Sequence, residues 1–475
     1  MTDNNHILNQ LDASPTKKFF VEMLTRDIEI EDAILDLLDN CVDGIQRIAN
    51  NNNEHHQPYK GFWAKLTLSS DHFIIEDNCG GIPKDIAESY AFRMGRPNNN
   101  IDNDVYTIGT YGIGMKRAIF KMGRSSEIVS QTNNESFTVK IHPEWLIDDN
   151  DWHLPLEFTD PILEQSGTLI KVTNLYSHIQ QGFSPLQSTV VNSLVNKIAY
   201  NYSYIIDKGF SIIVNGKKVT SQPFNLLWEG TDKISERETI APYLYKYDKD
   251  GIEIKIAVGF YRGTASQTEV DEEMEGNRKS SEKAGWTIVC NDRVILYCDK
   301  TRLTGWGEEK VPSYHPQFIA ISGIVYFRSK DTKKLPITST KRGIDASSDI
   351  YLYIKNYMRE GMKLFTAYTN KWKENLPQEK KISAKATEVD PIEIFTTIPD
   401  NLWKPVRGKN YEKKYSPKLP MPPAKNSTIK RKNIKFARPI QEIQIVAEYL
   451  FEDADREASE VGDECFEKVL KEANE

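Results

Sequence analysis

The sequence has few of the features that mark secreted or membrane proteins. Its five cysteines form no CxxC pair and no even set, so we expect reduced thiols rather than a disulfide framework. No run of about 18 apolar residues occurs, and the polar N-terminus holds no apolar signal core. We therefore expect a soluble, cytoplasmic protein without a membrane partner.

An excess of charge of one sign is also missing. The 475 residues carry 61 basic and 68 acidic side chains, which gives a net charge of −7. This value argues against a chain that is basic throughout, although it leaves room for a local basic patch. The length exceeds what one hydrophobic core usually supports, so we expect two or three domains.

The most informative segment is a helical pattern over residues 27–49, which contains EDAILDLLDNCVDGIQRI. Apolar residues recur at helical spacing on one face, and polar residues recur on another. Asp36 and Asn40 lie one turn apart, so their side chains point into the same space. A carboxylate can orient a water molecule, and an amide oxygen can bind a hard cation. An ordinary acidic face in solvent is the alternative interpretation.

A second motif, HFIIEDNCGGIPKD, combines a predicted strand with a glycine turn. Asp77 ends the strand, and Gly80 and Gly81 follow. A carboxylate at a strand end can accept a hydrogen bond from the amino group of adenine, while glycines let the ring approach the backbone. A plain strand-to-helix turn with an aspartate cap is the alternative.

A third motif, YTIGTYGIGMKRAIFKMG, places three glycines before a predicted helix over residues 115–122. Successive backbone amides at a helix N-terminus form an anion site, to which Lys116 adds charge. The spacing GxxGxGxK is neither a Walker A loop nor a dinucleotide fingerprint. A glycine hinge that binds nothing is the alternative.

Taken together and in this order, with Gly167-Thr168 opening a later strand, these motifs resemble the GHKL ATPase superfamily. That superfamily includes type II topoisomerases, MutL, the ninety-kilodalton heat-shock chaperones, histidine kinases and MORC proteins. The motifs span residues 31–176, and the pattern AxxDLxDNxxDG…DNxGGI…IGxYGxGxK…GTxIxVxNL looks most similar to MORC-like members. The resemblance implies a Bergerat-type α/β sandwich that holds ATP and Mg²⁺ under a lid.

The resemblance also implies roles for individual residues. Asn40 would bind Mg²⁺, Asp36 would act as general base, and Asp77 would contact adenine with support from Thr168. The other cofactor-binding residues that it implies, including the lid, are Asp43, Gly81, Ile82, Gly109, Thr110, Tyr111, Gly112, Ile113, Gly114, Met115 and Lys116. Two positions depart from the family pattern: Asp36 stands where glutamate is usual, which predicts slow turnover, and Cys79 stands where the adenine loop usually has its first glycine.

Residues 206–372 resemble, less specifically, the α/β transducer domain of dimerising GHKL ATPases. Such a domain delivers a lysine to the γ-phosphate, and Lys341 in LPITSTKRGID lies in a polar loop between a predicted strand and a long helix. A cation there would neutralise charge that develops on the transferred phosphoryl group. A solvated surface lysine is the alternative.

The fold class that we expect is α+β, a Bergerat-type sandwich followed by a transducer domain and a helical tail. Residues 401–438 hold twelve Lys or Arg against one acid, which is typical of an extended linker, whereas residues 441–475 hold twelve acids against three bases. The expected parts are an N-terminal arm (1–20), an ATP-binding domain (21–205), a transducer-like domain (206–372), a basic proline-containing linker (373–438) and an acidic helical tail (439–475).

The function that we expect is Mg²⁺-dependent ATP binding with slow hydrolysis, which would drive N-terminal dimerisation of a MORC-like clamp. The partners would be a second copy of the chain and either DNA or a protein such as a nuclease or client, in a defence or genome-maintenance setting. Two alternatives stay open: an Hsp90-like remodelling protein or signalling adaptor switched by ATP, and a pseudoenzyme that binds ATP without hydrolysing it.

Overall fold

The computed structural model of this chain describes most of its length. The described residues are 16–48, 57–93, 105–109, 112–149, 151–184, 189–222, 224–230, 238–276, 281–338, 341, 343–423 and 434–474. The chain divides into two compact units, Met1–Pro422 and Pro423–Glu475. Of the predicted site, Thr110 and Tyr111 lie outside the described residues, as do the first fifteen residues of the expected arm.

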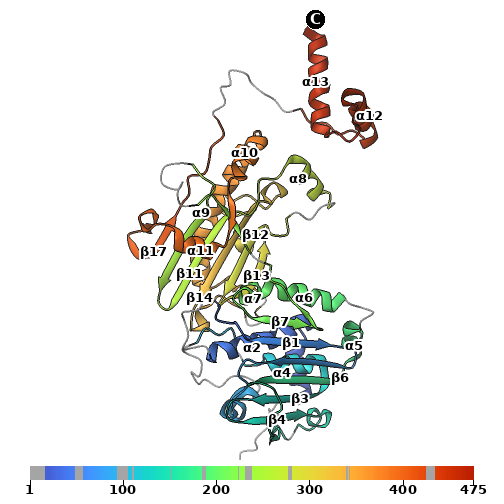
Figure 1. Cartoon of the computed structure of the whole chain (residues 1–475), viewed down its shortest axis with the longest axis vertical. Coiled ribbons are helices and arrows are strands. Elements are labelled where there is room, and N and C mark those ends of the chain that lie inside the picture. The colour runs from blue at the N-terminus through green and yellow to red at the C-terminus, as the bar shows by residue number, and fades with distance from the viewer. Residues whose placement is uncertain are drawn as a thin grey trace, which may run out of the picture. The chain divides into compact units, whose positions relative to one another are not determined.

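The N-terminal part of the first unit contains a largely antiparallel sheet (Figure 1). Within the described residues its eight strands have the order β5-β4-β3-β6-β2-β1-β7-β8, and the β1–β7 pair is parallel. The strands are β1 (Trp63–Leu68), β2 (His72–Asp77), β3 (Gly123–Gln131), β4 (Ser136–Ile141), β5 (Leu156–Phe158), β6 (Gly167–Leu175), β7 (Ser211–Val214) and β8 (Lys217–Lys218). The β7–β8 hairpin turns at Asn215 and Gly216, which both have the positive φ that a type I′ turn requires.

Helices cover one face of this sheet because alternate strand residues are apolar. Leu66 of β1, Phe73 of β2 and Val172 of β6 are buried in one core with the helices. The helices are α1 (Lys17–Thr25), α2 (Ile30–Ile48), α4 (Gly114–Met122), α5 (Ser177–Phe183), α6 (Thr189–Asn201) and α7 (Ser203–Asp207). The apolar face of α2 enters this core, and Asp36, Asn40 and Asp43 of the same helix line a cavity.

The start of α1 differs from the expected arm over residues 1–20. Lys17 is buried, and its Nζ donates a hydrogen bond to the carbonyl oxygen of Trp145 at 2.7 Å. The same ammonium lies 4.0 Å from the centre of the Trp145 ring. The tertiary contacts of a single lysine, which local sequence does not reveal, therefore fix this segment to the domain.

A second sheet follows in the same unit, with the strand order β13-β12-β14-β11-β10-β17-β16 among the described residues. Its strands are β10 (Tyr243–Lys249), β11 (Ile252–Phe260), β12 (Gly285–Cys290), β13 (Arg293–Asp299), β14 (Ile321–Arg328), β16 (Lys404–Val406) and β17 (Lys409–Tyr415). The long helix α9 (Asp349–Trp372) buries Ile354, Met358 and Phe365 against it, as its periodicity predicts. The smaller elements are α8 (Gln267–Met274), α10 (Leu376–Ser383), α11 (Pro391–Thr397) and the pair β9 (Leu226–Trp228) and β15 (Thr387–Val389).

The expected linker over residues 373–438 is wrong for much of its length. β17 pairs with β10 and therefore extends the second sheet. Its Glu412 is buried and accepts hydrogen bonds from the hydroxyl groups of Tyr245 at 2.8 Å and Tyr353 at 2.6 Å. Lys409, Lys413 and Lys414 of this strand are only half-buried, so its basic composition does not reveal the buried contacts of Glu412.

The second unit contains the two helices of the expected acidic tail, α12 (Ile440–Phe451) and α13 (Ala458–Asn474), which contact each other. Ile445, Tyr449, Phe466 and Val469 are exposed on them. The mixed architecture of the whole chain confirms the α+β fold class. No helix among the described residues is both long enough and apolar enough to cross a lipid bilayer.

Candidate functional site

A cavity of about 590 Å³ lies over the polar face of α2. Its walls come from α2, the loop after β2, the start of α4, the first residues of β6 and a loop of the second sheet domain. Every described member of the predicted site lines it, namely Asp36, Asn40, Asp43, Asp77, Gly81, Ile82, Gly109, Gly112, Ile113, Gly114, Met115, Lys116, Thr168 and Lys341. The fold thus brings together segments that are up to about 300 residues apart in the sequence, and the size is that of a small-molecule site.

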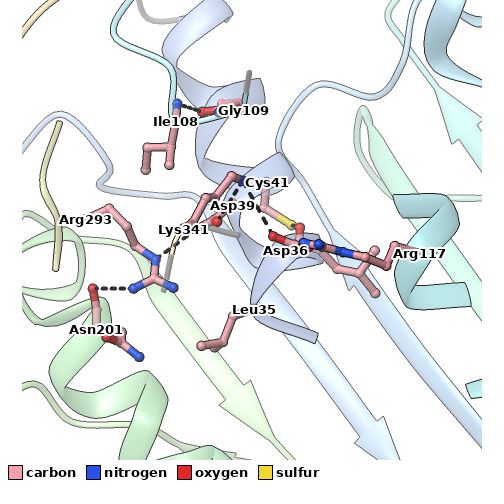
Figure 2. A network of polar contacts seen from close by, with 12 residues as sticks. Leu35, Asp36, Asp39, Cys41, Ile108, Gly109, Arg117, Asn201, Arg293 and Lys341 are labelled. Atoms are coloured by element: carbon pink, nitrogen blue, oxygen red, sulfur yellow. Dashed lines mark hydrogen bonds and ion pairs between the residues drawn. The ribbon is translucent and has the colours of Figure 1, made fainter. Parts of the chain in front are cut away.

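Asp36 is buried at the floor of this cavity between two cations (Figure 2). Its Oδ2 accepts a hydrogen bond from Nη2 of Arg117 on α4. Its Oδ1 lies 3.7 Å from Nζ of Lys341. Gly114 begins α4 directly above it, and a Cβ atom there would lie 3.2 Å from Cβ of Asp36, so glycine permits this close approach.

Asp39, the residue before Asn40 on α2, links the domain of the first sheet to the domain of the second sheet. Its carboxylate accepts hydrogen bonds from Nε of Arg293 at 2.9 Å, from Nζ of Lys341 at 3.0 Å and from the hydroxyl of Tyr202 at 2.7 Å. Burial by itself would raise the pKa of Asp39, but Lys341 and Arg293 outweigh it and lower that pKa to about 2. The lysine from the second domain is therefore held on the floor of the cavity by a fully ionised partner.

Asp43 fixes the start of the predicted lid. Its two carboxylate oxygens accept hydrogen bonds from the backbone amides of Ile108 at 2.7 Å and Gly109 at 2.8 Å. A Cβ atom at Gly109 would lie 2.6 Å from Oδ2 of Asp43, so a side chain at this position would displace that carboxylate oxygen. Burial is the main reason that the pKa of Asp43 is raised.

Lys116 binds backbone carbonyl groups rather than a carboxylate. Its Nζ donates hydrogen bonds to the carbonyl oxygen of Ala91 at 2.7 Å and to that of Gly112. Burial lowers the pKa of Lys116 to about 8. The ammonium thus stays close to the cavity wall, where an anionic ligand would be a stronger partner than two carbonyl groups.

Asp77 lines the same cavity beside two thiols. Its Oδ1 accepts a hydrogen bond from the amide of Cys79 at 2.7 Å, and its Oδ2 accepts one from Sγ of Cys41 at 3.5 Å. Burial raises the pKa of Asp77 to about 6. Thr168 pairs with Asp77 across β2 and β6, which explains why a Gly-Thr pair so far along the chain belongs to the same site.

Three residues that shape the site were not predicted. Asp39 lies within the first motif, but on an isolated helix it cannot be told from a solvent-facing acid. Arg117 follows Lys116 directly in the third motif, and this position in the sequence could have indicated that it belongs to the site. Arg293 begins β13, and the sequence around it gives no sign that it reaches α2.

The first sheet and its helices form an α/β sandwich with a cavity of small-molecule size. Residues 28–168 match the family model described as "Histidine kinase-, DNA gyrase B-, and HSP90-like ATPase". This part of the chain is therefore a GHKL-type ATPase domain, and the match confirms the resemblance to that superfamily. The presence of this domain supports ATP binding by the chain. The match names no narrower group such as MORC proteins. A search of curated proteins found no similar sequence.

Proposed function

We propose that the chain binds Mg²⁺·ATP in this cavity, hydrolyses it slowly and uses it to drive N-terminal dimerisation of a clamp. The observation that carries the proposal is the convergence of the separated motifs on one cavity, with Lys341 reaching it from the second sheet domain. Because this cation belongs to another domain, a nucleotide that binds it would also change the position of that domain.

The two ends of the cavity suit the two ends of the nucleotide. Asp77 provides an acceptor for the amino group of adenine, and Thr168 lies beside it. The lid residues, Lys116 and Lys341 provide the amides and cations that a triphosphate requires. Asn40 offers an amide oxygen at the cavity wall, and Mg²⁺ prefers a few such oxygen ligands in addition to water and phosphate oxygens. When bound, Mg²⁺ would neutralise charge on the phosphates.

Asp36 is our candidate for the general base. Its hydrogen bond from Arg117 fixes the carboxylate on the cavity floor, and this contact competes with a water molecule for the same oxygen. The shorter aspartate side chain and the competing guanidinium both support slow turnover. The proposed attacking water would use the oxygen that faces Lys341.

Loss of Asn40 tests nucleotide binding. We expect Asn40→Ala to weaken Mg²⁺-dependent ATP binding by about tenfold or more, measured by calorimetric titration with and without Mg²⁺. Asn356→Ala, on the exposed face of α9, is the control and should bind as the wild type does. Equal affinities of the wild type and Asn40→Ala would rule out the assigned metal ligand.

Dimerisation is tested separately. Sedimentation of the wild type with and without a non-hydrolysable ATP analogue should show a nucleotide-dependent gain in mass or a more compact dimer. The exposed apolar residues on α12 and α13 favour a second contact through the tail. A protein that is monomeric in both conditions would exclude the clamp.

DNA is the favoured second ligand, because Lys404, Arg407 and Lys413 lie on the edge pair β16–β17 of the second sheet. Binding to unrelated duplexes that falls steeply with salt would support it. ATP-dependent binding of a protein client that ignores salt would favour the remodelling or adaptor role instead.

A further inference from the structure

Two thiols and a carboxylate meet in the wall of the cavity. Sγ of Cys41, Sγ of Cys79 and a carboxylate oxygen of Asp77 all lie within 4.8 Å of one another. Cys41 comes from α2, whereas Asp77 ends β2 and Cys79 follows it in the next loop. All three residues are buried, yet all three line the cavity, so a small ligand that enters the cavity can reach them.

The charge balance of this cluster differs from that of Asp36 and Asp39 on α2. Asp36 pairs with Arg117, and Asp39 pairs with Arg293. Among the residues that the structure describes, Asp77 forms no ion pair with a lysine or arginine. Its Oδ2 instead accepts a weak thiol hydrogen bond from Cys41. A buried carboxylate without a cationic partner is costly, so a bound cation would stabilise it.

We propose that Cys41, Cys79 and Asp77 form a binding site for a thiophilic divalent metal ion of the Zn²⁺ class, and that the bound ion excludes the nucleotide. Two thiolates and one carboxylate are ligands that Zn²⁺ accepts, and three protein ligands leave a fourth position for a water molecule from the cavity. Both thiols lose their protons to solvent when the metal binds, and the oxygen that accepted the thiol hydrogen bond takes the metal instead.

The inhibitory part of this proposal rests on the proposed function, because it assigns Asp77 to adenine. A metal ion on that carboxylate would remove the acceptor for the adenine amino group and would occupy the space that the ring needs. Zn²⁺ would thus lower ATP binding without touching the phosphate end, where Asn40 and Lys341 lie. Metal binding itself does not depend on that assignment.

Cobalt provides a direct readout of the site. We expect Co²⁺ titrated into the reduced full-length chain to give a thiolate-to-metal charge-transfer band with one ion per chain, and Zn²⁺ to abolish it. Cys41→Ala and Cys79→Ala should each weaken Co²⁺ binding by about tenfold or more. Cys465→Ala, in the tail helix α13, is the matched control and should keep the band. The absence of a band in the wild type, or an equal band in both cavity variants, would overturn the proposal.

A second measurement needs no variant of the cavity. Zn²⁺ should protect Cys41 and Cys79 of the wild type from alkylation, read by mass spectrometry, and should leave the labelling of Cys465 unchanged. Equal labelling of the two cavity thiols with and without Zn²⁺ would contradict the site even if the variants fail to fold.

Adenosine separates the two hypotheses, because it has no phosphates to chelate the metal. Saturating adenosine should raise the apparent dissociation constant of Co²⁺. If Co²⁺ binds through both thiols and adenosine has no effect on it, the metal site stands and the assignment of Asp77 to adenine is the part that fails.

Discussion

Nζ of Lys341 lies 3.0 Å from Oδ2 of Asp39, across the boundary between the two sheet domains. Burial tends to lower the pKa of Lys341, but Asp39, Asp36 and Asp43 outweigh it and raise that pKa. The lysine therefore stays charged in the cavity without a nucleotide. In our proposal a triphosphate competes with Asp39 for this cation, and the competition couples ATP binding to the position of the second domain.

Lys341 is expected to matter more for hydrolysis than for binding. We predict that Lys341→Ala lowers the rate of ATP hydrolysis by about 100-fold or more, because it removes a cation that faces the transferred phosphoryl group. Lys333→Ala, an exposed lysine in the segment after β14, is the control and should leave the rate unchanged. Steady-state phosphate release measures both, and equal rates would mean that Lys341 acts only as a structural ion pair.

Asp36 is expected to act in the chemical step. We predict that Asp36→Asn lowers single-turnover hydrolysis by about 100-fold while ATP still binds. Asp32→Asn makes the same chemical change one turn earlier on α2, where Asp32 lies 3.7 Å from Lys197 and outside the cavity lining. If the wild type and Asp36→Asn are equally inactive, the chain is a pseudoenzyme that only binds ATP.

Asp39 is expected to stabilise the fold. Asp39→Asn would leave Lys341 and Arg293 buried without a full counter-charge, so we predict a loss of about 3 kcal/mol in the free energy of unfolding. Urea denaturation at neutral pH measures this loss. Asp248→Asn, at an exposed position on β10, is the control and should change the free energy little.

The pH dependence of that loss follows from the lowered pKa of Asp39. Its pKa falls from 3.8 to about 2 on folding, so the unfolded chain binds more protons than the folded chain between these values. The contribution of about 2 kcal/mol is present above pH 4 and disappears as the pH falls through 2. The stability difference between the wild type and Asp39→Asn should therefore shrink over this interval, and a constant difference would show that the carboxylate charge is not the cause.

Asp77 is expected to make adenine recognition sensitive to mild acid. Burial raises its pKa to about 6, and protonation weakens a carboxylate as an acceptor. We predict that adenosine affinity is highest above pH 7 and falls by up to about tenfold per pH unit below 6. Adenosine avoids the phosphate groups of ATP, which titrate nearby. A flat profile from pH 5 to 8 would argue against Asp77 as the adenine contact.

Gly81 is expected to be irreplaceable for steric reasons. Its φ is +73°, and a Cβ atom there would lie 2.3 Å from the carbonyl oxygen of Gln131. Gly61 has a similar φ of +92°, but a Cβ atom at that position would meet no other atom within 4 Å. We predict that Gly61→Ala costs about 1 kcal/mol of stability and that Gly81→Ala costs about 3 kcal/mol. Thermal unfolding of the two variants compares them, and equal losses would remove the steric argument.

Local pattern determined a large part of this protein before any tertiary contact was known. The periodicity of α2 and α9, the hairpin turn at Asn215 and the glycine motif before α4 each depend on residues that are close in sequence. The motif order was sufficient to name the members of one cavity, because each motif places its polar groups at the end or on one face of a regular element.

The tertiary structure decided what those groups meet. Three contacts join distant segments: Lys341 and Arg293 pair with Asp39, residues 404–415 extend the edge of the second sheet, and Cys41 meets Asp77. Such contacts leave no trace in local periodicity or composition, because which partner a buried charge or strand edge finds depends on how the whole chain packs.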